Sequence, residues 1–309
     1  MQLTNFKNLN MTNLFNFLLC FLPVSFILGN LAININLVLL IIFSVIFFKN
    51  NILKFKLTFA DKIVIVIFLF SFLSGLINFY LNIKSDFISP EVNLKILLKS
   101  ILFSKYLLLY FSIRVIIEEK IFNFKFFFIS ASLCAIFVSL DLFLQFTAGQ
   151  DLFGNLKSPY KNSGPFGDEL IAGSYLQRFS IFVFILAVTF LKIKNKKFLF
   201  IFLFLLFTLI FSSMLIAGNR MPTILFLLLF GILFSLKKNL RKFLIILTLF
   251  ICIIFSFMVK INPQVKSNTR DFVRLINVIV VSAKEAVVEN KKPNLNNTYV
   301  KEFYSGYMA

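Results

Sequence analysis

Two apolar runs joined by three residues decide the fold: FLFIFLFLLFTLIFSSMLIA at 198–217, GNR at 218–220 and MPTILFLLLFGILFSL at 221–236. A helix rises about 1.5 Å per residue and a bilayer core is about 30 Å thick, so each run has roughly the length of one membrane crossing. The three intervening residues suffice only for a turn. We therefore expect a helical membrane protein in which Arg220 lies at a turn between two spans.

Similar apolar runs recur along the 309-residue chain, 59% of which is hydrophobic. They predict an all-α, polytopic integral membrane protein with about nine transmembrane helices. The expected spans are 13–29, 33–48, 63–81, 97–117, 126–146, 175–191, 198–217, 221–236 and 243–259. Residues 1–259 would thus form a transmembrane helical domain, and residues 260–309 a segment outside the membrane.

The distribution of basic residues predicts the orientation. The inner loops and the N-terminal segment would contain Lys7, Lys49, Lys54, Lys56, Lys62, Arg114, Lys120, Lys125, Lys192, Lys194, Lys196, Lys197, Lys237, Lys238, Arg241 and Lys242. The outer loops would contain fewer: Lys84, Lys95, Lys99, Lys157, Lys161, Arg178 and Arg220. Because basic loops stay on the cytoplasmic side, we expect a cytoplasmic N-terminus and a tail on the outer side of the membrane.

Several functional classes are disfavoured. The formal charge of +19 comes mainly from these loop clusters, so we expect membrane lipids and no nucleic acid as partners. Cys20, Cys134 and Cys252 lie in separate apolar runs, and the chain has no histidine. We therefore predict no disulfide framework, no metal site and no cofactor. There is no Walker-type loop and no Ser-His-Asp set.

Two outer segments differ from the short loops. The first, 147–174, contains half of the ten glycines, and a loop of this length and composition is typically functional or disordered. The second is the tail, 260–309, where apolar residues recur at helical spacing and predict a helix on the bilayer surface. These apolar residues are Val265, Phe272, Leu275, Ile276 and Ile279.

The outer half of the predicted membrane domain gathers five charged residues: Arg220, Arg178, Asp168, Glu169 and Asp141. A charge at membrane depth costs about 2.5–3.5 kcal/mol on insertion scales, so such side chains usually face a cavity or one another. A shared, outward-facing polar cavity is one interpretation. The alternative is that the two arginines reach lipid phosphates while Asp168 and Glu169 are simply solvated.

The fourth predicted span contains three further basic residues, Lys99, Lys105 and Arg114. Their spacing along the span is uneven, so they define no single face. Extension toward the interface, or pairing with Asp141, would account for them.

An arginine pair facing a cavity suits a phosphate or diphosphate, because guanidinium is permanently charged and binds such oxygens in a bidentate fork. The same geometry would stabilise charge on a diphosphate leaving group. Gly167 and Gly173 would let the backbone approach a sugar or a headgroup closely.

These residues also suggest a family. The stretch Gly164-Pro165-Phe166-Gly167-Asp168-Glu169-Leu170-Ile171-Ala172-Gly173-Ser174-Tyr175-Leu176, followed by Gly218-Asn219-Arg220, resembles the bacterial O-antigen ligase/polymerase family. In that family a G-F-x-G/N-x-N-x-x-G-x-Y segment precedes a G-S-R turn. Asp168-Glu169 and Asn219 are variants of the usual residues, and the likeness extends from about residue 126 to the end of the chain.

The resemblance implies a metal-independent membrane glycosyltransferase of surface polysaccharide assembly, including lipopolysaccharide biosynthesis. It would transfer a glycan from a polyprenyl diphosphate carrier to a lipid or saccharide acceptor at the outer face of a bacterial inner membrane, so that the tail would be periplasmic. Arg220 would bind the donor diphosphate, with Arg178 as a second candidate. The family also uses a histidine in a large periplasmic loop, followed by further spans, and this sequence has neither. We therefore identify no catalytic residue and expect the front portion of a longer protein, or a natural short form, that binds donor without turnover.

Two other functions stay open. A transporter or flippase for a lipid-linked saccharide or an organic anion would use Arg220 and Arg178 to bind cargo, although no repeated halves are visible. A non-catalytic membrane subunit would account for the missing histidine.

Overall fold

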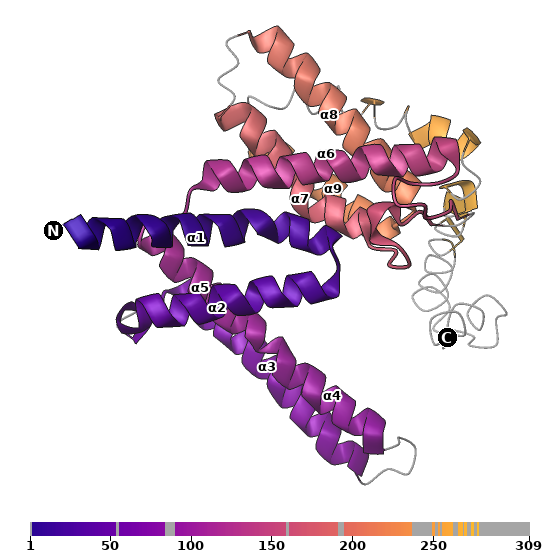
Figure 1. Cartoon of the computed structure of the whole chain (residues 1–309). Helices are drawn as coiled ribbons and strands as arrows, with labels where there is room; N and C mark the ends of the chain where they lie inside the picture. Colours follow the sequence, from indigo (N-terminus) through magenta and orange to yellow (C-terminus); the bar gives the residue numbers. More distant parts are fainter. Residues whose placement is uncertain are drawn as a thin grey trace. The chain divides into compact units, whose positions relative to one another are not determined.

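The computed structural model describes residues 2–53, 56–83, 90–158, 161–190 and 195–236, with short pieces between 249 and 277. In this part of the chain the regular elements are helices, and the β-structure is one isolated bridge, between Gln150 and Leu156 (Figure 1). The chain divides into a first unit, Met1–Ala131, and a second unit, Ser132–Ala309. Each is described separately below.

Helices α1 to α5 and the start of α6 form the first unit. Their bounds are α1 Gln2–Ile27, α2 Asn30–Leu53, α3 Phe59–Ile83, α4 Pro90–Phe103, α5 Lys105–Glu118 and α6 Phe124–Ala148. Helix α1 packs on α2, α2 packs on α5, and α3 and α4 lie side by side as a hairpin (Figure 1). The predicted span 97–117 thus comprises parts of two helices, separated by Ser104 alone.

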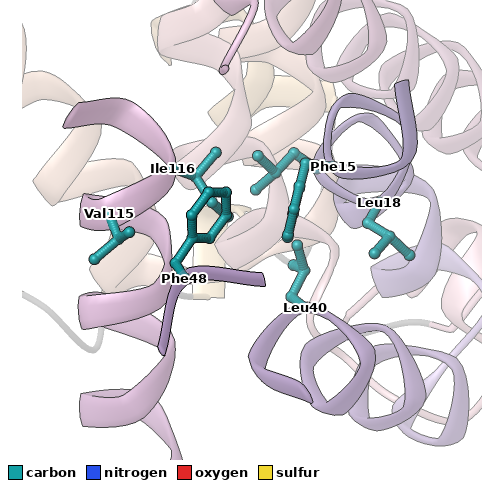
Figure 2. Packing of buried hydrophobic residues seen from close by; sticks show 7 residues of the cluster. Phe15, Leu18, Leu40, Phe48, Val115 and Ile116 are labelled. Carbon is teal, nitrogen blue, oxygen red and sulfur yellow. The ribbon is translucent and has the colours of Figure 1, made fainter. Parts of the chain in front are cut away.

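A cluster of apolar side chains joins α1, α2 and α5 (Figure 2). Its buried members are Phe15, Leu18, Leu19, Leu40, Phe48, Val115 and Ile116. The rings of Phe15 and Phe48 lie 5.4 Å apart between centroids. Because lipid tails are as apolar as these side chains, close packing rather than removal from water holds such helices together.

A buried ion pair joins α3 to α5. The Asp61 side chain, fully buried, forms a salt bridge with Arg114. It also accepts hydrogen bonds from the Tyr110 hydroxyl, 2.8 Å, and from the Thr58 backbone N–H, 2.6 Å, and hydroxyl, 2.8 Å. Arg114 additionally contacts Glu118 at 3.2 Å. A buried charge is tolerated when its hydrogen-bonding capacity is filled in this way.

Two basic residues of the fourth predicted span, Arg114 and Lys105, have partners other than Asp141, with which the sequence-based interpretation would pair them. Arg114 pairs with Asp61, not with Asp141. Lys105 donates to the side-chain oxygen of Asn34 on α2 at 2.6 Å. The sequence could not identify these partners because α2 and α3 are distant from α5 along the chain.

Up to residue 236, the described residues of the second unit form the rest of α6, a short 3-10 helix and three longer helices. Their bounds are η1 Gly164–Phe166, α7 Ala172–Thr189, α8 Lys196–Ala217 and α9 Arg220–Leu236. Helix α8 begins where Asn195 accepts hydrogen bonds from the backbone of Lys197 and Phe198, and it ends at Gly218 in the left-handed conformation, φ +75°. The first is a common N-cap and the second a common C-cap. Helix α7 packs against α8 and α9.

Six helical segments of the described residues are long and apolar enough to cross a membrane. They are Asn30–Phe48, Phe59–Leu81, Val92–Glu118, Phe124–Ala148, Ala172–Thr189 and Lys197–Ala217. A shorter apolar helix, Met11–Ile27, matches the first predicted span, and α9 matches the eighth. The all-helical class of a polytopic membrane protein is thus supported, whereas the count of nine spans stays a prediction.

The C-terminal predictions are largely untested. Much of the predicted span 243–259 lies outside the described residues, as do Phe272, Leu275, Ile276 and Ile279 of the predicted surface helix. Val265 is described and is buried. The domain boundary at 259 stays a prediction.

The predicted orientation can be tested with single cysteines placed in a background that lacks the three native ones. Leu156, 77% exposed in the loop after α6, and Asn195, exposed before α8, are suitable positions. We expect a membrane-impermeant maleimide to label Leu156→Cys in intact spheroplasts and to label Asn195→Cys only after permeabilisation. Reversed labelling would move Arg220 to the cytoplasmic side.

Breaking the buried ion pair should destabilise the first unit strongly. Arg114→Ala leaves the buried Asp61 charge uncompensated, which typically costs about 3–5 kcal/mol, whereas Asp61→Ala leaves Arg114 paired with Glu118 and should cost less. The double variant should lose less than the sum of the two losses. Glu118→Ala is the control, because that side chain is 52% exposed and such a pair contributes about 0.2–0.5 kcal/mol. Unfolding in detergent measures these losses, and equal effects of Asp61→Ala and Glu118→Ala would contradict this assignment.

Candidate functional site

The glycine-rich loop between α6 and α7 is fixed by a buried glutamine. Gln145, fully buried one turn before the end of α6, donates from Nε2 to the carbonyl oxygens of Asn155, 3.2 Å, and Leu156, 3.3 Å. Its Oε1 accepts a hydrogen bond from the Gly164 N–H at 2.9 Å. One side chain thus binds backbone groups on both arms of the loop. Such bonds are required because a buried backbone polar group must find a partner.

Two carboxylates are buried beside this glutamine. Asp141 of α6 is 1% exposed, and its Oδ1 accepts from the Leu152 N–H at 2.9 Å. Asp151 is 4% exposed and accepts from the backbone N–H of Phe153, 3.0 Å, and Asn155, 2.6 Å, and from the Asn155 side chain, 2.6 Å. The second set is an Asx-type turn, in which an aspartate binds the backbone that follows it.

The other end of the loop is attached to α8. The Asn162 side chain, 2% exposed, donates to the Ile216 carbonyl oxygen at 3.0 Å, one of the last carbonyls of that helix, which lack an intrahelical partner. Gly164 has φ +55°, and a Cβ there would lie 3.2 Å from the Leu142 side chain. The loop therefore packs closely on α6 and α8.

The two sequence segments that carry the family resemblance contact each other. The Asn219 side chain donates to the Leu170 carbonyl oxygen at 3.0 Å. A Cβ at Gly173 would lie 2.8 Å from the Cβ of Asn219, closer than real atoms approach, so only glycine fits there without movement. The turn that precedes α9 thus lies against the start of α7.

Helix α9 begins at Arg220, directly after this contact. The guanidinium position lies outside the part of the chain that the structure describes. Arg178 is exposed on α7, although its neighbours Tyr175 and Phe179 are buried. The second candidate arginine thus lies on the outer surface of its helix.

The remaining candidate residues divide into two groups. Asp168 and Glu169 are exposed in the loop, whereas Asp141 and Gly173 are buried. Gly167 has φ +61°, a conformation that favours glycine. The polar cavity that these residues would share stays a prediction.

The sequence-based interpretation missed the residues that hold the loop: Gln145, Asp151, Asn155 and Asn162. The Asp151-Leu152-Phe153-Gly154-Asn155 stretch is a recognisable turn pattern, so this part could have been found. Nothing in the sequence distinguishes Gln145 or Asn162 from a solvated polar residue near a helix end.

No protein-family model, curated protein or solved structure matches the chain. The resemblance to the O-antigen ligase/polymerase family therefore depends on the two short sequence segments alone.

Substituting Gly173 tests the contact between these segments. Gly173→Ala should destabilise the protein by about 1–3 kcal/mol, because the new methyl group overlaps Asn219. The matched control is Gly231→Ala on α9, where the added Cβ would meet no described atom within 4 Å and alanine should stabilise the helix by up to about 1 kcal/mol. Thermal unfolding in detergent gives the comparison. A harmless Gly173→Ala would show that α7 and the turn do not pack as described.

Proposed function

We propose that the chain is a membrane glycosyltransferase of the O-antigen ligase/polymerase type. It would use a glycan carried on polyprenyl diphosphate as donor and a lipid or saccharide as acceptor, at the periplasmic face of a bacterial inner membrane. The support is the contact between the glycine-rich segment and the Gly218-Asn219-Arg220 turn. Two segments that the family resemblance pairs in sequence are thus neighbours in space.

The chemistry at this contact suits an anion. Arg220 is the first residue of α9, and the first turn of that helix contains no acidic residue. A helix N-terminus presents unpaired backbone N–H groups and a partial positive charge. Together with a guanidinium, this arrangement favours a diphosphate, first as bound donor and then as leaving group. A neutral cargo would gain little from it.

The residues at this contact would account for donor binding but not for the transfer of the glycan. An acceptor hydroxyl is a weak nucleophile, and general-base help contributes about 10²–10⁴ in rate. The sequence contains no histidine for this role. Donor binding is therefore the step to test with this chain.

Binding of a polyprenyl diphosphate-linked sugar to the purified chain should depend on Arg220. We expect Arg220→Ala to weaken binding at least tenfold, and Arg220→Lys nearly as much, because lysine cannot form the bidentate fork. The control is Arg270→Ala, which removes an exposed arginine elsewhere in the second unit and should leave binding unchanged. Microscale binding measurements in detergent, with the polyprenyl monophosphate as competitor, provide the values.

Unchanged binding in Arg220→Ala would refute the donor-site assignment. Binding that depends on Arg220, together with movement of the intact lipid-linked sugar across proteoliposomes, would instead support the flippase alternative. Arg178→Ala tests the second candidate arginine in the same assay.

A further inference from the structure

We propose that the loop hairpin that follows α6, residues 149–157, dips back into the membrane, where its tip, Leu152 and Phe153, contacts the acyl chains of the lipids. The partner of this tip is the bilayer itself, in the leaflet that surrounds the C-terminal half of α6. This placement requires neither glycan transfer nor a particular orientation of the chain.

The two arms of the loop hairpin lie at the level where α6 ends. Gln150 and Leu156 form the isolated bridge. The Lys157 N–H donates to the Gly149 carbonyl oxygen at 2.8 Å, and the ammonium of the same lysine donates to the Phe146 carbonyl oxygen, also at 2.8 Å. A lysine whose charge lies beside the last turn of a membrane helix is typical of the boundary between lipid and water. The arms therefore lie near the membrane surface.

The tip of the loop hairpin contacts α6 further inside the membrane. The Leu152 N–H donates to Asp141 Oδ1 at 2.9 Å, and the rings of Phe153 and Phe137 lie 6.4 Å apart between centroids. Asp141 and Phe137 lie about 10 and 16 Å before the end of α6 at Ala148, because a helix rises about 1.5 Å per residue. Since α6 has 25 residues and a hydrocarbon core needs roughly 20, both positions lie within the core.

The tip lies beside a face of α6 that is itself exposed and apolar. Phe137 belongs to a stripe of residues spaced three or four positions apart, which share one face of a helix. The exposed members of this stripe are Leu133, Leu140 and Leu144. On a membrane-spanning helix such a stripe faces acyl chains. Leu152 and Phe153, which continue this apolar surface, are 63% and 62% exposed.

The backbone of the tip is prepared for a place without water. An irregular segment at membrane depth needs protein partners for its polar groups. The buried Asp151 carboxylate accepts hydrogen bonds from the N–H groups of Phe153, 3.0 Å, and Asn155, 2.6 Å, and its carbonyl oxygen accepts from Gly154 at 3.3 Å. Together with the bond from Leu152, four successive N–H groups have partners. The tip therefore presents apolar side chains and bonded donors, a combination that suits lipid better than water.

Tryptophan fluorescence can test this placement, because the chain contains no native tryptophan. We expect Phe153→Trp in lipid nanodiscs to lose roughly half of its emission or more when the lipids are brominated in the upper part of their acyl chains, since the indole would lie among them. The water-soluble quencher acrylamide should have little effect. The matched control is Leu156→Trp in the shallow arm, 77% exposed, which acrylamide should quench strongly and brominated lipid weakly. Leu140→Trp on the exposed stripe provides the signal of a lipid-facing position.

Each outcome supports or overturns the proposal. Acrylamide quenching of Phe153→Trp as strong as that of Leu156→Trp would place the tip in water and overturn it. Protection of Phe153→Trp from both quenchers would show that protein covers the tip, and would overturn it as well. Leu152→Trp repeats the measurement at the neighbouring position if circular dichroism shows that Phe153→Trp does not fold.

Discussion

The need to satisfy backbone hydrogen bonds away from water governs this structure. Most of the chain meets it with helices, which bond their own backbone. Among the described residues of the second unit, the segment between α6 and α7 is irregular, and there Gln145 binds backbone groups at Asn155, Leu156 and Gly164. An irregular segment is tolerated at a membrane boundary where protein groups bind its backbone. The position of the candidate site therefore depends on the buried side-chain amide of Gln145.

Asp61 of α3 and Asp141 of α6 are both buried, but their carboxylates are hydrogen-bonded to different extents. Asp61 has an arginine, a tyrosine hydroxyl and a threonine around it, so its charge is compensated by groups of the chain itself. Asp141 has one backbone partner and an unpartnered oxygen. A saturated carboxylate ties helices together and leaves nothing for a ligand. Asp141 differs in that one of its two oxygens accepts no hydrogen bond from the described residues.

The sequence predicted the features of the fold that depend on residues close together in the chain. Apolar runs follow from composition, so the predicted span 126–146 lies within α6, 198–217 within α8, and the loop 147–174 closely matches the connection between α6 and α7. The sequence did not predict that Ser104 separates α4 from α5, because the apolar pattern continues on both sides of that residue. Partners such as Asp61 for Arg114 involve residues far apart along the chain, which no local pattern encodes.

The contact between Gly173 and Asn219 explains why the two short segments carry more information together than apart. A glycine motif and a three-residue turn each occur often by chance. Their contact requires a glycine at position 173 of α7, because a side chain there would overlap Asn219. It also requires Gly218 in the left-handed conformation, which ends α8 just before Arg220. These requirements place the first residue of α9 beside the loop. The backbone position of Arg220 is therefore set by the packing of two helices and one turn, and a functional role for this residue stays a proposal.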